Sequence, residues 1–214
     1  MKRRTRPGRF FVLEGLDGAG TTTQARLLTA WLKSRGRRVH VTAEPSGGPV
    51  GALVRQVLTR RVVGGGNDGA SLDPCALALL FAADRLDHAA VEIAPRLAGG
   101  SDVVSDRFTL SSLAYQSLTC RAPRWVEAIN ARALVPDLTL FLEVSPRTAV
   151  RRRFAASDRR EIFEVPTFQR RVAQAYRAGI ARLRAMGQRV VVVDGERPVE
   201  EVTAALARVV SRFL

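Results

Sequence analysis

The sequence predicts an α/β fold in which a five-stranded, mainly parallel sheet is flanked by helices. The first observation is that short apolar runs rich in Val, Leu and Phe alternate with longer segments whose apolar residues recur at helical spacing. The second is that the first run ends in a glycine-rich turn leading directly into a helical pattern, as in the repeating units of parallel sheets. The 214 residues, 46% of them hydrophobic, are enough for one compact domain over residues 1–214, and no linker divides them.

Each predicted strand is a short apolar run bounded by glycine, proline or charged residues. The helix after the first strand is expected over residues 22–36, where Gly36 is a natural C-cap. A long helix is expected over 73–100, after a glycine-rich loop at 64–69. The five strands are predicted at residues 9–14, 38–44, 102–107, 137–144 and 188–196.

The chain is strongly basic, with 34 lysine and arginine residues, 20 acidic residues and a formal net charge of +14. Only Lys2 and Lys33 are lysines, so nearly all of the positive charge is on arginine, which binds phosphates in bidentate fashion. This composition favours anionic partners, namely nucleic acid, a membrane surface or phosphorylated metabolites. Because no basic motif is interleaved with aromatic residues, nucleic acid is the less favoured of these partners.

The N-terminal residues 1–8 form a basic tail that is not followed by the cleavage site of a signal peptide. No run approaches the roughly 20 apolar residues of a membrane span, so no membrane association is expected. Cys75 and Cys120 are far apart in sequence and belong to no C-x-x-C motif, which argues against a zinc site and against a disulfide scaffold. These features predict a cytoplasmic protein.

The segment GLDGAGTTTQ, residues 15–24, has the glycine spacing of a phosphate-binding loop, G-x-x-x-x-G-K-[ST]. In such a loop, backbone N–H groups and the N-terminus of the following helix hold a di- or triphosphate. Thr22 is at the Ser/Thr position whose hydroxyl coordinates Mg²⁺, but Thr21 stands where the lysine is expected. The alternative is a structural turn that no longer binds nucleotide. The predicted ATP phosphate-binding residues are Gly15, Gly18, Ala19, Gly20, Thr21, Thr22 and Thr23.

Neither lysine of the chain can take the place of the missing one. Lys33 lies on the same predicted helix, about 18 Å from Thr21 at 1.5 Å per residue, and Lys2 is in the tail. The missing charge must therefore come from arginine or from Mg²⁺. Asp106, at the end of the apolar run VVSD, has the position of an aspartate that helps to hold Mg²⁺, with a simple capping role as the alternative. The predicted metal ligands are Thr22 and Asp106.

With these motifs, the chain resembles the thymidylate kinases, which transfer the γ-phosphoryl group of ATP to dTMP. The resemblance is carried by FFVLEGLDGAG at 10–20, EPSGGPVGALVRQVL at 44–58, LLFAADRLDH at 79–88, SDRFTLSSLAYQ at 105–116, DRRE at 158–161 and VVDGERPVEEV at 192–202. It covers nearly the whole chain and implies the P-loop nucleoside monophosphate kinase fold, with a short arginine-rich lid at about 150–164. It also implies MgATP as phosphate donor, a homodimer and a role in dTTP biosynthesis.

The resemblance further implies an acceptor site for dTMP. Asp17 would accept a hydrogen bond from the 3′-OH of the deoxyribose, and Tyr115 would press on C2′ and disfavour a ribose hydroxyl. Phe81 would stack on thymine and Arg85 would bind the base edge, since residues four apart on a helix share a face. Core packing is the alternative for these side chains. The implied dTMP-binding set is Asp17, Glu44, Arg55, Phe81, Arg85, Arg107, Ser112, Tyr115 and Gln116.

Arginines are implied at both phosphates. Arg107 and Arg55 would clamp the acceptor phosphate, and Arg152 best matches the first lid arginine of the family, with Arg153 and Arg159 close to it in sequence. Because phosphoryl transfer spreads negative charge over the equatorial oxygens, a cation that arrives on lid closure stabilises it. A solvated helix face is the alternative for this arginine run. The implied catalytic set is Asp17, Arg107, Arg152, Arg153 and Arg159.

Several positions depart from the family pattern. Thr21 removes a lysine that normally bridges β- and γ-oxygens, and the loss of such a charge costs several kcal/mol in a closed site. Ala43 replaces the arginine often found before the EP pair, and residues 46–49 alter the usual turn. Gly18 stands where one branch of the family has a catalytic arginine, so the lid is expected to supply that arginine here.

The sequence therefore predicts a dTMP kinase in which lid arginines replace the missing lysine. One alternative is a kinase with another acceptor, such as a deoxynucleoside or another nucleotide. A second alternative is a catalytically silent protein that binds nucleotides or nucleic acid, because of Thr21 and the high positive charge.

Overall fold

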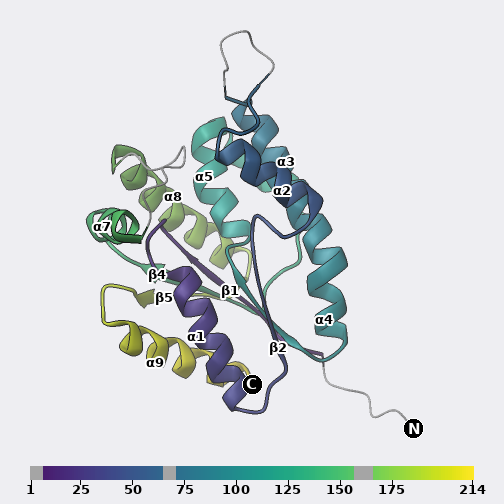
Figure 1. Ribbon diagram of the computed structural model, residues 1–214, viewed down its shortest axis with the longest axis vertical. Coiled ribbons are helices and arrows are strands. Elements are labelled where there is room, and N and C mark those ends of the chain that lie inside the picture. The colour runs from purple at the N-terminus through teal and green to yellow at the C-terminus, as the bar shows by residue number, and fades with distance from the viewer. Residues whose placement is uncertain (1–6, 65–70, 157–165) are drawn as a thin grey trace.

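The computed structural model describes residues 7–64, 71–156 and 166–214. Its centre is a five-stranded sheet in the order β2-β3-β1-β4-β5, with every neighbouring pair parallel. The predicted α/β class and the five predicted strands are confirmed (Figure 1). The strands are β1 (Phe10–Gly15), β2 (Val39–Ala43), β3 (Asp102–Asp106), β4 (Leu138–Glu143) and β5 (Val190–Asp194).

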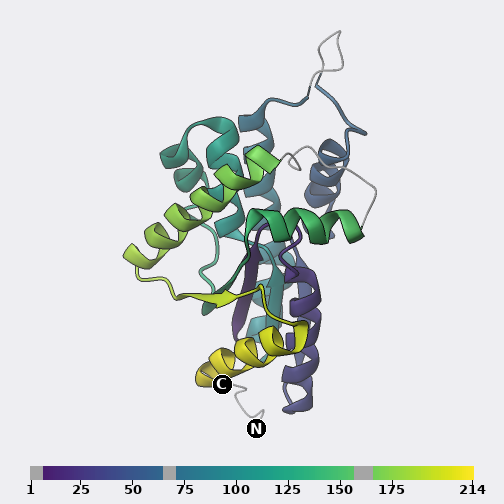
Figure 2. The same cartoon turned by 90° about the vertical axis from the view of Figure 1, so that its left-hand side faces the viewer.

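Helices cover both faces of this sheet (Figures 1 and 2). On one face, α1 and α9 pack on each other, and α1 also contacts β1, β2 and β3. On the other face, α5 and α8 pack together, and the segment from α3 to α4 runs beside them. The α-helices are α1 (Thr21–Ser34), α2 (Pro49–Leu58), α3 (Pro74–His88), α4 (Ala94–Ala98), α5 (Thr109–Cys120), α6 (Pro123–Ile129), α7 (Pro146–Ala156), α8 (Pro166–Ala185) and α9 (Val199–Val210).

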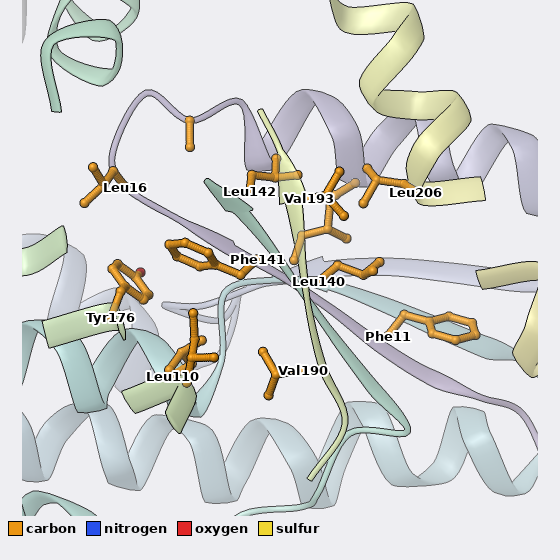
Figure 3. Close-up of a cluster of buried hydrophobic side chains, with 14 of the residues drawn as sticks. Phe11, Leu16, Leu110, Leu140, Phe141, Leu142, Tyr176, Val190, Val193 and Leu206 are labelled. Atoms are coloured by element: carbon orange, nitrogen blue, oxygen red, sulfur yellow. The ribbon is translucent and has the colours of Figure 1, made fainter. Parts of the chain in front are cut away.

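The core follows from the apolar runs of the central strands. All six residues of β1 are buried, as expected for a strand covered by helices on both faces. Successive side chains alternate between the layers: Phe11 belongs to the cluster with Leu206 of α9, whereas Phe10 packs against Phe108 and Ile93. In Figure 3, side chains of β4 and β5 such as Leu142 lie between the helices at the centre of this cluster.

The predicted helix over 73–100 is helical along its length but is not one regular α-helix. Between α3 and α4 the chain forms the wider π-helical turn η1 (Ala89–Ile93). Pro95 follows directly and lacks the N–H that an unbroken α-helix would bond to the carbonyl of Val91. The C-cap of α1 is Arg35 rather than the predicted Gly36, which is the next residue; Gly36 has φ +74° and donates from its N–H to the carbonyl of Lys33, which completes the turn at the helix end. The chain ends with the short helix η2 (Ser211–Phe213).

Several predicted segments fall wholly or partly outside the described residues. These are residues 1–6 of the basic tail, residues 65–69 of the glycine-rich loop and residues 157–164 of the lid, which include Arg159. Among the helices of the described residues, none has the length and apolar character needed to cross a bilayer.

The two cysteines are distant in sequence but meet in the fold. Cys120, at the end of α5, donates from Sγ to the carbonyl of Pro74 at 3.3 Å, directly before Cys75 at the start of α3. Both thiols are free. Burial and the neighbouring Cys75 thiol raise the pKa of Cys120 to about 12, so it stays protonated at neutral pH.

Candidate active site

The parallel strands direct the loops that follow them to one edge of the sheet, where ligands bind in open α/β folds. A pocket of about 940 Å³ lies there, between the loop after β1, the helices α2, α3 and α5, the helix α7 and the loop after β5. It brings together residues predicted from distant parts of the sequence. Those that line it are Asp17, Gly18, Ala19, Gly20, Thr21, Thr22, Thr23, Glu44, Arg55, Phe81, Arg85, Arg107, Ser112, Tyr115, Gln116, Arg152 and Arg153.

Two further predicted residues lie just behind the lining, and one cannot be placed. Gly15 ends β1 and is buried beneath the glycine loop, while Asp106 ends β3 and is 9% exposed. Arg159 lies outside the described residues. The pocket therefore gathers nearly the whole predicted set around one cavity.

The glycine loop has the backbone conformation that its glycines permit. Gly18 and Gly20 have φ of +90° and +93°, a region that side chains rarely adopt, and Gly20 is the N-cap of α1. A Cβ on Gly18 would lie 2.2 Å from the carbonyl oxygen of Ala149 in α7. The chain therefore has no room for the arginine that one branch of the family carries at this position. The N-terminal turn of α1 carries no acidic residue and lines the pocket, so its free N–H groups favour an anion there.

Thr21 begins α1 and is 5% exposed. Its short side chain lies against the loop: a Cβ added to Gly15 would be only 3.2 Å from Cγ2 of Thr21. Lys33 lies in the last turn of the same helix, at the end away from the loop, as predicted. Within the described part of the chain, the basic residues that line the pocket are Arg55, Arg85, Arg107, Arg152, Arg153 and Arg197.

The two predicted metal ligands are neighbours. The hydroxyl of Thr22 donates to Oδ2 of Asp106 at 2.5 Å. The other carboxylate oxygen of Asp106, Oδ1, is buried and has no hydrogen-bond partner in the part of the chain that the structure describes. An oxygen pair of this kind fits Mg²⁺, which takes one or two protein oxygens and completes its octahedron with water and phosphate oxygens.

Arg107 lies at the centre of a cluster of polar side chains. Its Nη2 donates to Oδ1 of Asp17 at 2.6 Å, and its Nη1 donates to the hydroxyls of Ser111 and Tyr176, both at 3.1 Å. The hydroxyl of Tyr115 donates to the second oxygen of Asp17 at 2.9 Å. Burial alone would lower the pKa of Arg107, but the opposing effects of Tyr176 and Asp17 are larger together. The pKa is therefore raised above its ordinary value, and this guanidinium is always charged.

The electrostatics of Tyr115 are set by the same cluster. Burial and the Asp17 carboxylate raise the pKa of Tyr115 above its ordinary value. The phenol therefore stays protonated and acts as a hydrogen-bond donor toward Asp17. Tyr115 and Arg107 also contact each other through the ring face, with the guanidinium carbon 5.6 Å from the ring centroid.

Arg85 is held from several directions although it is only 1% exposed. Its Nη2 donates to Glu44 at 2.7 Å and to the carbonyl of Phe108 at 3.1 Å. Its Nη1 donates to the hydroxyl of Ser112 at 3.0 Å and to the side chain of Asn130. Its Nε is buried and has no hydrogen-bond partner among the described residues. Glu44 thus compensates the charge of Arg85, as a buried cation requires.

The turn after β2 is held by side-chain hydrogen bonds. The hydroxyl and the N–H of Ser46 both donate to the buried carboxylate of Asp84, at 2.5 and 2.8 Å. Arg55, which is exposed, donates to the carbonyls of Pro45 and Ser46 and lines the pocket. Phe81 packs at the edge of the cluster formed by α2 and α3, with its ring also at the pocket wall.

The described part of the lid contributes two arginines. Arg152 of α7 donates from Nη1 to the carbonyl of Gly195 at 2.8 Å and from Nη2 to the carbonyl of Glu196 at 3.4 Å. Arg153, beside it in sequence, also lines the pocket. Both side chains are half-buried.

Sequence reasoning missed several residues of this site. Glu14, Ser111 and Tyr176 surround Arg107 from β1, α5 and α8, and the loop 195–199 closes one wall of the pocket. Tyr176 resembles a core residue because it falls on the apolar face of α8 with Val172 and Ile180. Glu14 had a signal, since it is a lone charge inside the buried run FFVLEG.

Comparisons with known proteins give a consistent result. The family model described as thymidylate kinase matches residues 13–206. A thymidylate kinase of Leifsonia xyli is 41% identical over 94% of this chain and 93% of its own length. A probable thymidylate kinase of Pyrococcus abyssi is 36% identical over 97% of this chain and 98% of its own, and a thymidylate kinase of Thiobacillus denitrificans is 40% identical over 94% and 96%.

Proposed function

The chain belongs to the thymidylate kinase family, and we propose that it transfers the γ-phosphoryl group of MgATP to dTMP, giving dTDP and ADP. One observation carries the proposal: a single pocket joins a phosphate-binding loop to a second set of polar and aromatic side chains that suits a nucleoside monophosphate. Such an arrangement allows two nucleotides to meet phosphate to phosphate, and positioning of this kind accounts for much of phosphoryl-transfer catalysis.

The donor half consists of the glycine loop and the N-terminus of α1. We propose that the N–H groups of residues 18–23 bind the ATP phosphates, and that Thr22 and Asp106 hold Mg²⁺ against them. When bound, this ion neutralises charge on the transferred phosphoryl group. The partnerless Oδ1 of Asp106 supports this assignment, because a buried carboxylate oxygen normally has a partner.

The acceptor half lies between α2, α3 and α5. Phe81 offers a ring face for a base, and Arg85 lies at the same pocket wall as a candidate donor to the base edge. Asp17 and Tyr115 lie where they suit the deoxyribose, and Arg55 and Arg107 suit its phosphate. Glu44 and Ser112 act on the base through their hydrogen bonds to Arg85. The buried Gln116 completes this wall.

Thr21 stands where the phosphate-loop motif has a lysine. We propose that Arg152 and Arg153, with Arg159 of the lid, supply the positive charge that Thr21 lacks. Arg152 supports this because its guanidinium already lies at the pocket wall, held by two backbone carbonyls that a phosphate can replace as partners. Homodimer formation, a cytoplasmic location and a role in dTTP biosynthesis complete the proposal, as the resemblance implies them.

A second candidate function rests on Thr21 itself. A protein that binds both nucleotides without transferring the phosphoryl group would keep the acceptor set and lack the charge that stabilises the transition state. Binding and turnover must therefore be measured separately.

The test is a coupled ADP-release assay with ATP, Mg²⁺ and each of dTMP, dUMP, thymidine or no acceptor, run beside calorimetric dTMP binding. We expect dTMP-dependent turnover in the wild type and its collapse in Arg152→Ala. Turnover with thymidine but not dTMP would support a deoxynucleoside kinase. Binding of dTMP without turnover, restored by Thr21→Lys, would support the silent protein.

A further inference from the structure

Glu14 is a fully buried carboxyl group at the carboxyl end of β1. Its Oε1 accepts from the N–H groups of Phe108 and Ser111, at 2.9 and 3.0 Å. Its Oε2 accepts from the hydroxyl of Ser111 at 2.6 Å and from that of Tyr176 at 3.3 Å. A buried carboxyl costs free energy unless such bonds compensate it, so this one has a defined structural task.

The backbone partners of Glu14 belong to the turn that carries Arg107. Arg107 has φ +74°, a left-handed conformation that a non-glycine residue adopts only where its surroundings enforce it. Directly after it, α5 begins at Thr109 without any side-chain cap of its own. The carboxyl of Glu14 supplies that cap from a neighbouring strand, because it accepts from two N–H groups at the start of α5, of which that of Ser111 also donates to the carbonyl of Phe108 at 3.2 Å.

The side-chain partners of Glu14 also hold the guanidinium of Arg107. Ser111 and Tyr176 donate to Glu14, and the oxygens of the same two hydroxyls accept from Nη1 of Arg107. The single proton of the Tyr176 hydroxyl is shared between Glu14, at 3.3 Å, and the carbonyl of Gly15, at 3.0 Å, which ties the tyrosine to the end of β1. With Nη1 held in this way, Nη2 is directed at Asp17 and the pocket.

We infer that Glu14 is the positioning residue of the acceptor-phosphate clamp: acting through the turn 107–111 and the hydroxyls of Ser111 and Tyr176, it fixes the direction of the Arg107 guanidinium. The inference deepens the proposed function and rests on it only for the identity of the phosphate. Glu14 does not touch the substrate, since two hydroxyls stand between its carboxyl and Arg107.

We expect the protonation of Glu14 to change when the acceptor binds, and this change can be measured. Burial raises the pKa of Glu14 to about 7, against the opposing effect of Arg107 and of the hydrogen bonds from Ser111 and Phe108. The titratable groups that face it are Arg107 from the turn after β3 and Tyr176 from α8, with Asp17 beyond Arg107. A phosphate dianion on Arg107 offsets the attraction between Arg107 and Glu14. Acceptor binding is therefore accompanied by proton uptake near pH 7.

The test compares Glu14→Gln, which keeps shape and an acceptor oxygen, with Asp102→Asn. Asp102 is an equally buried carboxyl at the opposite end of the sheet, where it accepts from Arg37 at 2.7 Å. In crystal structures without nucleotide we expect Arg107 to leave Asp17 in Glu14→Gln and to keep its place in Asp102→Asn. We expect Glu14→Gln to weaken calorimetric dTMP binding about tenfold, the loss of about one hydrogen bond to a charged group, and to abolish proton uptake, with ATP binding unchanged.

If Arg107 keeps its ion pair with Asp17 in Glu14→Gln, the inference is wrong, whichever ligand the protein binds. Displacement of Arg107 in a protein whose wild type binds no dTMP would instead refute the proposed function and leave the positioning role standing. If Glu14→Gln does not fold, Ser111→Ala removes one of the two linking hydroxyls and keeps the carboxyl. Unchanged Arg107 geometry and unchanged dTMP affinity in that variant would refute the relay through Ser111.

Discussion

Arg107 and Asp17, which belong to different loops of the chain, form an ion pair whose Nη2–Oδ1 distance is 2.6 Å. Each residue is predicted to bind a different part of dTMP, namely the phosphate and the 3′-OH. In the structure they instead satisfy each other, with Tyr115 and Gln169 as further donors to Asp17. These side chains are therefore already ordered in the free site, before any acceptor is bound.

Replacement of Asp17 tests this pairing. We expect Asp17→Asn to lower kcat/KM for dTMP about 100-fold, because the change weakens both a sugar contact and the orientation of Arg107. Steady-state kinetics with dTMP as the varied substrate measure the effect. Glu127→Gln, which breaks the exposed ion pair with Arg182, is the matched control and should behave as the wild type. Equal kinetics for Asp17→Asn and the control would contradict the assignment of Asp17.

Removal of the Asp106 carboxylate tests the metal assignment. We expect Asp106→Asn to raise the Mg²⁺ concentration for half-maximal turnover about tenfold or more, because an amide oxygen is a weaker ligand for a hard cation. A Mg²⁺ titration at saturating ATP and dTMP measures it, with Asp137→Asn as the control. Asp137 pairs with Arg9 at the other end of the sheet, so its loss should leave the Mg²⁺ dependence unchanged. An unchanged titration for Asp106→Asn would remove Asp106 from the metal site.

The fold was predictable because its signals are local. The strand runs are short and mostly apolar, fully buried in β1 and β3 and partly exposed in the edge strands β2 and β5. The predicted and observed strands differ by no more than two residues at an end. The π-helical turn at Ala89–Ile93 was not predictable in the same way. It depends on how Pro95 ends one hydrogen-bond ladder inside an otherwise regular helical pattern.

Site residues could be predicted only where their type and their spacing in the sequence match a known binding motif. Glycine spacing identified the phosphate loop, and the family resemblance identified Arg85 and Arg107. Neither could reveal how these arginines are held, because their partners Glu44, Tyr176 and Asn130 come from separate elements. A tyrosine on an apolar helix face and an asparagine at a helix end have the same local pattern whether or not they hold an arginine.

Gly18 and Gly20 provide a pair of substitutions that differ in one respect. Both have φ near +90°, so alanine at either position costs about 1 kcal/mol or more of backbone strain. A Cβ at Gly18 would also meet the carbonyl of Ala149 at 2.2 Å, whereas one at Gly20 has no atom within 4 Å. We expect Gly18→Ala to lower the free energy of unfolding measured in urea clearly more than Gly20→Ala does. Equal losses would show that α7 moves away at little cost.

The buried carboxyl of Glu14 predicts a pH dependence of stability. Its pKa is raised by burial to about 7 from an ordinary value of 4.5, so the folded state binds a proton more tightly than the unfolded state. The stability linked to this proton is fully present below pH 4.5 and is lost as pH rises to about 7, by about 3 kcal/mol in all. Glu14→Gln removes this dependence, so the free energy of unfolding of the wild type should fall relative to that of the variant between pH 5 and about 7.5. Urea denaturation of both proteins across this range measures the difference, and parallel curves would show that Glu14 titrates near its ordinary value in the fold.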